Sequence, residues 1–464
     1  MKRRDFLRST AALGAGMGLA GCGRTESVPQ SPVDYKPGGP LPWINWAGNE
    51  YCYPNARPAP RTTAELVDVM QQAGGSVRAV GAGHSFSAVV PTDDTLISTD
   101  LMTGLIAHDP GSLQARVYAG TTLHDLGPLL HGIGQAVPNL PDMDYPTLGG
   151  AIATSVHGTG TGFGSLSAGV TGLTLVSPSG EVFECSPASN VEVFNAARCS
   201  VGALGVTSEV TLQNQAPFRL TEVNRVEPLA DVWASLGDRC EKHRHFEFFP
   251  VPYSELCITV TTDPALPGDR DEGRDDPYGV LALRQAFEAV GWIPFFGPSI
   301  YDRLLQLSVA DAAETVRTGH SFEVLPHVRI VRFREMEYTV PADAGPACVQ
   351  EILATIRDRR LPVSFPFEYR YVKADDIWLS MFEGRDGCSI SIHQYGDLEY
   401  RHVFAEIEPI FWKYEGRPHW GKIHTLDAKR LKPLYPRWQD FQEVREALDP
   451  DSRMLNPHLR SLFT

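Results

Sequence analysis

The chain has 464 residues, 42% of them hydrophobic and 21% charged, and its formal net charge is −15 at pH 7. This length allows two or three domains with a large core, and the composition is ordinary for a soluble globular protein. Because so acidic a body is a poor partner for nucleic acid, a nucleic-acid-binding function is not expected.

Residues 1–21 have the pattern of an export signal. Arg3 and Arg4 precede a weakly apolar stretch over residues 10–20, which is too short to cross a bilayer. The paired arginines resemble a bacterial twin-arginine signal. Leu-Ala-Gly before Cys22 resembles a lipobox, which implies cleavage at that point and lipidation of the Cys22 sulfur. A plain signal peptide with an incidental cysteine is the alternative.

These signals predict a protein that is exported folded by the twin-arginine route. Its lipid would anchor it in the bacterial cell envelope, on the periplasmic side or at the outer surface. Residues 22–40 are rich in Pro, Ser and Gly and are expected to form a tether. Export in the folded state also favours a bound cofactor. The seven cysteines after Cys22 show neither a Cys-x-x-Cys pair nor zinc-ligand spacing, so no metal is expected.

The first loop of interest follows a predicted helix and strand. Thr62 and Glu65 form a capping-box pattern, and the helix that they open ends at two glycines, residues 74–75. A strand over 77–80 then leads into Gly-Ala-Gly-His at 81–84. Because glycine has no Cβ, backbone N–H groups in such a loop can approach a phosphate closely.

A second glycine-rich region spans residues 147–160, and the α+β unit that contains both regions is expected to end near residue 217. Neither standard phosphate fingerprint occurs: there is no Gly-x-Gly-x-x-Gly between a strand and a helix, and no Gly-x-x-x-x-Gly-Lys-Ser/Thr. Two separate glycine-rich loops can instead hold an extended dinucleotide from both sides.

The residues after 217 predict a second sheet-plus-helix unit. Strand patterns and one mostly helical stretch occur at 246–249, 281–315 (helical), 327–338, 369–373 and 389–395. Glu368 and Arg370 are two positions apart on a predicted strand, so their side chains share one face. Taken alone, such a pair of charged residues is more often a structural ion pair than part of an active site.

Seven short motifs carry a resemblance to a known family. The glycine-rich motifs at 81–87, 148–160 and 201–206 resemble the vanillyl-alcohol-oxidase type of FAD domain. Four further motifs resemble those of the sugar-1,4-lactone oxidase and alditol oxidase branch of that superfamily. They are Trp-Ala-Gly-Asn at 46–49, Phe-Glu-Tyr-Arg at 367–370, His-Trp-Gly-Lys at 419–422 and Leu-Asn-Pro at 455–457. The resemblance covers roughly residues 41–464, with the motifs in the expected order.

The resemblance implies an α+β fold with a FAD-binding domain at 41–217, an α+β substrate (cap) domain at 218–415, and a segment at 416–464 that returns to the FAD domain. The residues expected to bind FAD are Gly81, Ala82, Gly83, His84, Ser85, Thr147, Gly149, Gly150, Thr154, Gly158 and Val206. A ring nitrogen of His84 would be joined to the flavin 8α carbon. A loop histidine that only hydrogen-bonds backbone is the alternative.

The implied function is an FAD-dependent oxidoreductase that oxidises a CH–OH group of a sugar lactone, alditol or related polyol by hydride transfer to the flavin. Glu368, Arg370 and Lys422 are the expected catalytic residues, because two cations can stabilise a developing alkoxide while Glu368 positions Arg370 and accepts a bond from a substrate hydroxyl. Together with these three, Thr147 and His393 are expected to bind substrate, although His393 could equally face the core.

Three points stay open in the sequence. Tyr395 replaces an expected small residue, which is predicted to change the pocket volume and leaves the substrate undefined. Pro141 favours O2 as the acceptor, giving H2O2, whereas an envelope dehydrogenase that passes electrons to a quinone or cytochrome is the alternative. A lipoprotein that binds flavin without catalysis is a third reading.

Overall fold

The computed structural model describes residues 39–464 except 274–278, 291–292, 294–295 and 310–313. The export signal, Cys22 and nearly all of the tether lie outside the described residues. Within the described part, no helix is both long and apolar enough to cross a bilayer. The seven cysteines in this part, from Cys52 to Cys388, are all free thiols.

The first half is built around an antiparallel sheet of order β5-β6-β9-β7-β8, with the parallel pair β3-β4 and the hairpin β1-β2 beside it. Its strands are β1 (Trp43–Ile44), β2 (Tyr51–Cys52), β3 (Val77–Val80), β4 (Thr95–Ser98), β5 (Leu105–Asp109), β6 (Gln114–Tyr118), β7 (Val170–Val176), β8 (Val182–Cys185) and β9 (Val206–Gln213). Its helices are α2 (Thr63–Gln72), α3 (Leu123–Gly132), α4 (Leu148–Ala153), the 3-10 turn η1 (Leu166–Gly169) and α5 (Val191–Ala197).

The second half is built around one eight-stranded sheet of order β13-β10-β12-β11-β15-β16-β14-β17. Its strands are β10 (Arg219–Pro228), β11 (His245–Pro250), β12 (Leu256–Pro264), β13 (Thr315–His320), β14 (Phe333–Pro341), β15 (Glu368–Val372), β16 (Gly387–Tyr395) and β17 (Arg417–Pro418). Its helices are α6 (Leu229–Lys242), α7 (Gly279–Val290), α8 (Gly297–Val309), α9 (Ser321–Val324), η2 (Ala342–Ala344), α10 (Gly345–Arg359) and α11 (Arg401–Lys413).

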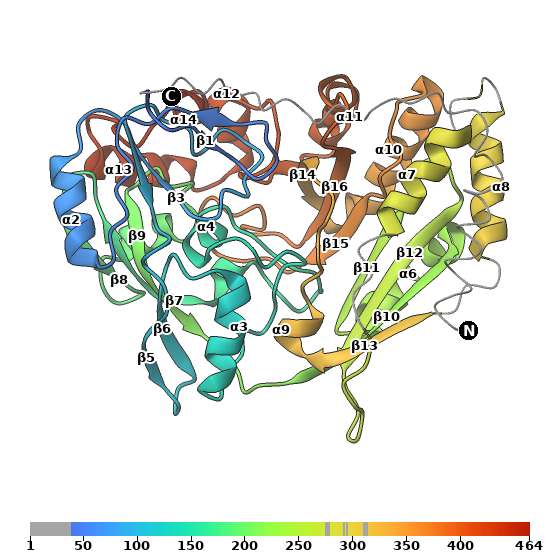
Figure 1. The fold of residues 1–464 in the computed structure, drawn as a ribbon, viewed down its shortest axis with the longest axis horizontal. Coiled ribbons are helices and arrows are strands. Elements are labelled where there is room, and N and C mark those ends of the chain that lie inside the picture. Colours follow the sequence, from blue (N-terminus) through green and yellow to red (C-terminus); the bar gives the residue numbers. More distant parts are fainter. Residues whose placement is uncertain (1–38, 274–278, 291–292, 294–295, 310–313) are drawn as a thin grey trace.

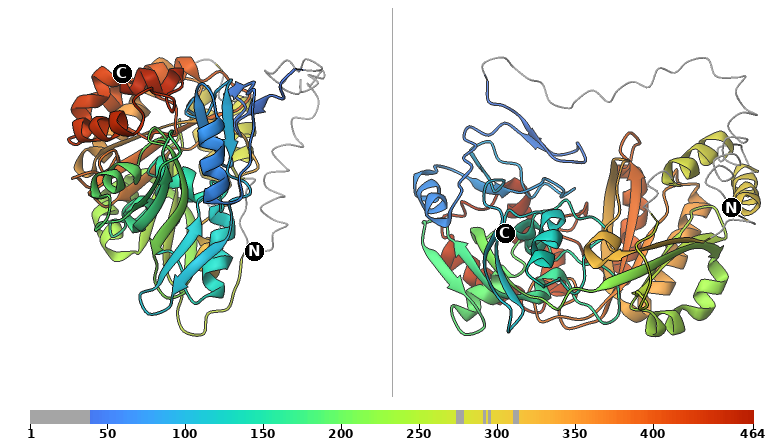
Figure 2. Two further views of the ribbon diagram at one scale, coloured as in Figure 1. Left: turned by 90° about the vertical axis from the view of Figure 1, so that its left-hand side faces the viewer. Right: turned by 60° about the horizontal axis from the view of Figure 1, so that its bottom comes forward.

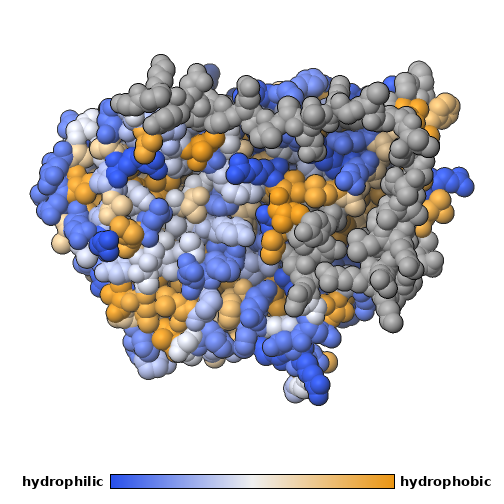
Figure 3. All heavy atoms as spheres, viewed as in Figure 1, coloured by the Kyte–Doolittle hydropathy of each residue, from blue (hydrophilic) through white to orange (hydrophobic). Residues whose placement is uncertain are grey.

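The two halves lie side by side, the first at the left and the second at the right of Figure 1, and Figure 2 shows them from two further sides. The chain then returns to the first half through α12 (Ala428–Leu431), η3 (Lys432–Leu434), α13 (Trp438–Leu448) and α14 (Pro457–Phe463). A single cluster of buried apolar side chains runs from α3 and α4 through the large sheet to α14. On the face seen in Figure 3, hydrophobic residues form separate groups among hydrophilic ones.

The elements agree with the sequence patterns in most places. The Thr62 side chain caps α2 by accepting the Glu65 N–H, as the capping pattern predicts. The strand expected at 327–338 is wrong at its start, because β14 begins only at Phe333. His327 and Arg329 instead contact Asp142, a loop residue of the first half. The His327 N–H donates to the Asp142 carbonyl, and Arg329 pairs with the Asp142 carboxylate.

Arg78 ties the first half together from inside. Its buried guanidinium donates to four backbone carbonyls, those of Val89, Val201, Gly202 and Met454, at 2.6–2.9 Å. Burial lowers the pKa of Arg78 to about 10, so the side chain stays charged at neutral pH. One side chain therefore joins the strand before the first glycine loop to the third glycine motif and to the C-terminal segment.

Replacing Arg78 by Met is expected to lower the free energy of unfolding by about 3–5 kcal/mol, because four buried carbonyls lose their donor. Urea unfolding followed by circular dichroism measures the loss. The matched control is Arg359→Met, whose side chain is 60% exposed beside Glu406 and which is expected to cost about 0.5 kcal/mol or less. Equal losses in the two variants would contradict this role.

Candidate active site

A cavity of about 510 Å³ lies between the two halves. One side is formed by the glycine-rich loops of the first half, over 78–86, 141–157 and 200–207, and the other by one face of the large sheet. The opposite face of that sheet packs against α6, α10 and α11. The cavity thus joins residues that are about 300 positions apart in the sequence.

The two glycine-rich loops meet at one wall of this cavity. A Cβ on Gly81 would lie 2.1 Å from Thr147 Oγ1, so that contact requires glycine. Thr147 also caps α4, because its hydroxyl accepts the Gly150 N–H. Gly149 packs closely as well, since a Cβ there would lie 3.0 Å from the Ala119 Cβ. The bare backbone of both loops is therefore presented at one surface.

His84 lies at the cavity wall between two aromatic rings. It stacks with Trp46 at a centroid distance of 5.2 Å and with Tyr145 at 5.7 Å. Burial, and then the nearby charge of Lys422, lower the pKa of His84 to about 4, so the ring is neutral at pH 7. Its Nδ1 is buried and has no hydrogen-bond partner among the described residues. Such an unpartnered nitrogen beside a glycine cradle fits a flavin held at this wall.

Ten of the eleven residues predicted to bind FAD line this cavity, and Gly158 does not. Gly158 lines a much smaller neighbouring pocket, where a Cβ would lie 2.3 Å from the Leu140 carbonyl oxygen. Its glycine is therefore explained by the packing of two loops. Pro141 also lines the main cavity.

Glu368 and Arg370 lie together on β15, on the sheet face that lines the cavity. Their charged groups are 3.4 Å apart, and Arg370 also lies 3.2 Å from a carboxylate oxygen of Glu337 on β14. Burial raises the pKa of Glu368 well above its usual value, although Arg370 opposes the shift. Burial opposes charge on Arg370 too, but these carboxylates hold its pKa above the ordinary value. The guanidinium is therefore held in its charged form, whereas burial disfavours the ionised form of Glu368.

Lys422 reaches the same face from the C-terminal segment. Its ammonium group pairs with Glu335 on β14 and lies 4.9 Å from the centre of the Phe86 ring. The backbone fixes this approach, because the Phe86 N–H donates to the Gly421 carbonyl at 2.7 Å. The third motif of the family branch, His-Trp-Gly-Lys, is thereby joined to the loop that carries His84.

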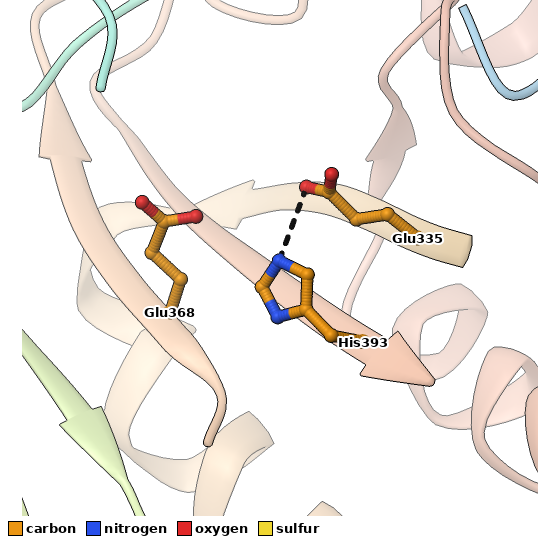
Figure 4. Close-up of side chains that lie close together, drawn as sticks. All are labelled: Glu335, Glu368 and His393. Carbon is orange, nitrogen blue, oxygen red and sulfur yellow. Dashed lines mark ion pairs between the residues drawn. The ribbon is translucent and has the colours of Figure 1, made fainter. Parts of the chain in front are cut away.

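His393 on β16 belongs to this group and not to the core alone. It lines the cavity, its Nε2 lies 3.7 Å from a Glu335 oxygen, and burial lowers its pKa. Figure 4 shows His393, Glu335 and Glu368 converging from three adjacent strands, and one ligand-type atom of each lies within 4.8 Å of the others. Such donors suit a divalent cation, but Lys422 already neutralises Glu335. The three side chains therefore form a polar part of the cavity wall.

Tyr395 does not lie where the sequence suggested. It is absent from the cavity lining and packs instead behind Phe365, which does line the cavity, with the two ring centres 4.8 Å apart. The predicted effect of Tyr395 on pocket volume is therefore corrected: Phe365 forms that part of the wall. Arg284 covers the other part of the Tyr395 ring at 4.8 Å, which explains why a large residue is accommodated there.

Several charged residues of the cavity were missed by the sequence analysis. Glu335 and Glu337 alternate on β14, and such alternation usually indicates a solvent-facing strand; here both are almost fully buried. Glu337 lies 2.6 Å from His157, a residue of the second glycine motif. Glu247 on β11 pairs across the sheet with Arg370, and burial raises its pKa to about 7. For Glu335 and Glu337 the sequence signal was the pairing of acids at alternate strand positions, whereas Glu247 is a single acid between two phenylalanines of β11.

Comparison with known proteins agrees with this geometry. The chain matches the FAD binding domain family over residues 54–186 and the D-arabinono-1,4-lactone oxidase family over 210–462. It therefore combines a flavin-binding half with a substrate half, as an FAD-dependent oxidoreductase acting on CH–OH groups does. The chain belongs to the D-arabinono-1,4-lactone oxidase family, which confirms the family predicted from the motifs.

Individual relatives span nearly the whole chain. It is 38% identical to an L-gulono-1,4-lactone dehydrogenase of Mycobacterium tuberculosis, covering 91% of this chain and 99% of the relative. It is 31% identical to an L-gulonolactone oxidase of Bos taurus (90% and 97%) and 29% identical to an alditol oxidase of a Streptomyces species (90% and 98%). Among solved structures, cholesterol oxidase from Brevibacterium sterolicum has the same fold, with a TM-score of 0.74 at 17% identity, over 93% of this chain and 100% of that one.

Glu337 provides a test of the buried charge network. Burial alone would raise its pKa, but Arg370, His157 and His419 together hold the pKa well below the ordinary 4.5. The stability that this carboxylate contributes is therefore fully present above pH 4.5 and is lost as the pH falls toward the lowered pKa. At pH 7, the free energy of unfolding of Glu337→Gln, measured by urea unfolding, is expected to be about 3–5 kcal/mol below that of the parent. This difference in free energy should narrow below pH 4.5.

The control for that measurement is Glu446→Gln, at an exposed carboxylate beside Arg445. This variant is expected to stay within about 0.5 kcal/mol of the parent at every pH. A Glu337→Gln difference that does not change between pH 7 and pH 3.5 would show that the carboxylate is not held ionised.

Proposed function

We propose that this protein oxidises a CH–OH group of a sugar lactone, alditol or related polyol at the face formed by Glu368, Arg370 and Lys422. The observation that carries the proposal is the single cavity that joins His84 and the glycine-rich loops to these three side chains. FAD, when bound there, supplies a two-electron acceptor for hydride. The names of the relatives place lactones and alditols first among the substrates to test.

The protein's own residues prepare the hydroxyl for oxidation. Arg370 and Lys422 place two positive charges beside the oxygen, where negative charge grows as the hydroxyl proton leaves. The proton can pass to the imidazole of His393, which lines the same cavity and whose pKa burial lowers. Glu368, whose pKa burial raises, can exchange hydrogen bonds with a second hydroxyl. Because Glu337 and Glu335 pair with Arg370 and Lys422, both cations keep fixed positions.

We also propose that His84 holds the flavin covalently through a ring nitrogen at the 8α carbon. Its neutral ring, its unpartnered Nδ1 and its place between Trp46 and Tyr145 support this assignment. The proposal extends to the N-terminus: export through the twin-arginine route and a lipid on Cys22 would keep the enzyme at the cell envelope, where a covalent bond retains a scarce cofactor.

Two electron acceptors are proposed. O2, giving H2O2, is supported by Pro141, which lines the cavity. A quinone or cytochrome of the envelope is the second candidate, and the 38% identical relative named a dehydrogenase favours it. The test is to reduce the flavin without air and then mix the protein with air. Rapid reoxidation supports O2 as the acceptor, and slow reoxidation supports a quinone or cytochrome.

Precipitation in acid tests the bond to His84. The parent protein is expected to give a yellow pellet, and His84→Ala a colourless pellet with yellow supernatant. Because the pKa of His84 is about 4, the rate of attachment to apoprotein should be flat between pH 6 and 8 and fall only as the pH approaches 4. His124→Ala, at an exposed histidine, is the control and should keep the yellow pellet. A yellow pellet from His84→Ala would contradict the assignment.

Anaerobic bleaching of the flavin tests the proposed reaction. L-Gulono-1,4-lactone or a five-carbon alditol is expected to bleach the parent protein. Arg370→Met should lower the second-order rate constant of bleaching by about 10²–10³-fold, because one of two charges at the developing alkoxide is lost.

The control for the kinetic test is Lys413→Met on the surface, whose side chain is 60% exposed beside Glu351 and which should change the rate less than twofold. If no lactone or alditol bleaches the parent flavin, the proposed substrate class is wrong. If Arg370→Met reacts as fast as the parent, the reaction takes place elsewhere.

A further inference from the structure

The cavity continues along the sheet beyond the reaction face. Arg370 on β15 pairs with Glu247 on β11, Glu247 pairs with Val260 on β12, and Val260 pairs with Asn224 on β10. Paired residues of antiparallel strands share a face, and all four line the cavity. Three strand spacings place Asn224 about 14 Å from Arg370 along the sheet. A single lactone bound at Arg370 would leave much of this length unfilled.

The walls of this extension have two kinds of surface. Phe249 and Ile258 pair with each other in the neighbouring row, line the cavity and are only partly buried, so an apolar strip runs beside Val260. On the other side, the Asn224 amide donates to Glu222 at 2.9 Å, and Glu222 is held by Arg317 at 3.0 Å. This leaves the Asn224 oxygen as an oriented acceptor. A strip of carbon beside fixed hydrogen-bonding groups matches a sugar ring, which has C–H faces and hydroxyl edges.

Glu247 is a polar group of this row that a ligand can reach. Its carboxyl oxygens face the cavity and are not enclosed by protein, although the residue as a whole is only 7% exposed. A carboxyl group that makes no hydrogen bond within the described part of the protein keeps its donor and acceptor sites open to a ligand. The carboxyl group lines the cavity between Arg370 and the apolar strip, so a hydroxyl of a bound ligand can supply the missing bond.

We infer that Asn224, Glu247, Phe249, Ile258 and Val260 form a distal subsite that binds a second sugar ring. The substrate that this enzyme prefers is then a glycosylated lactone or polyol, with the reacting carbon at Arg370 and the second ring on the apolar strip. This inference rests on the proposed function, since it extends the same site.

The test compares L-gulono-1,4-lactone with its 6-O-glycosyl derivative, whose added ring lies on the exocyclic arm away from the lactone carbonyl. Anaerobic bleaching of the parent flavin should have a second-order rate constant at least about tenfold higher for the glycosylated lactone. Ile258→Trp fills the strip and should remove this advantage. Asn224→Ala removes the oriented oxygen at the far end of the row and should raise the concentration for half-maximal bleaching by the glycosylated lactone alone.

Leu266→Trp is the matched control, because it adds the same indole at a position that is 70% exposed and away from the cavity. It should keep the full advantage. If both lactones bleach the flavin equally well in the parent, or if Ile258→Trp and Asn224→Ala keep the full advantage of the glycosylated lactone, the distal subsite is refuted and the proposed function stands. If neither lactone bleaches the parent flavin, both the proposed function and the subsite fail.

Discussion

The charge of Arg370, buried in the middle of a sheet, is the constraint on which the site depends. A buried guanidinium is tolerated only when carboxylates and hydrogen bonds surround it. Glu368 on the same strand and Glu337 on β14, which lies beyond β16, surround it, and Glu247 adds a third carboxyl group from the adjacent strand β11. A face with so many charges cannot pack against an apolar layer. The second half therefore packs its helices on the other face and leaves this one over a cavity.

The first half completes the cavity because the C-terminal segment returns to it. The Ser87 hydroxyl donates to the Trp420 carbonyl at 2.7 Å across 333 sequence positions, and the neighbouring Gly421 carbonyl accepts the Phe86 N–H. One loop thereby carries His84 on one side and anchors Lys422 on the other. The positions of the proposed flavin-bearing His84 and of the proposed catalytic cation Lys422 are therefore fixed by the same few hydrogen bonds.

The sequence predicted site residues that belong to distinctive short motifs, but not site residues that lie in common strand patterns. The glycine loops were recognisable because close backbone contacts such as Gly81 against Thr147 exclude a Cβ. The Glu368–Arg370 pair and Lys422 came from motifs with defined spacing, and the structure places all three at one cavity. Glu335 and Glu337 were missed because alternating acids on a strand look like a solvent-facing surface until another domain covers them. Glu247 was missed because it is a single acid among the apolar residues of β11. Tyr395 was misplaced because its position at the end of β16 puts it behind Phe365, which no local pattern records.

The sequence did not identify the substrate, for a related reason. The large eight-stranded sheet brings together β10, β11, β12 and β15 from residues 219–372, so the shape of the cavity depends on strand pairings between distant parts of the sequence. No short motif encodes such a shape. The acceptor likewise depends on the access of O2 or of a larger molecule to the flavin, and Pro141 is a single wall residue among many.

A crystal structure of the FAD-loaded protein, reduced and soaked without air with L-gulono-1,4-lactone, tests the central claim most directly. We expect electron density that joins His84 to the flavin, and a lactone hydroxyl within hydrogen-bond distance of both Arg370 and Lys422. A lactone bound away from these two side chains, or a flavin ring that lies outside the cavity between the two halves, would contradict it.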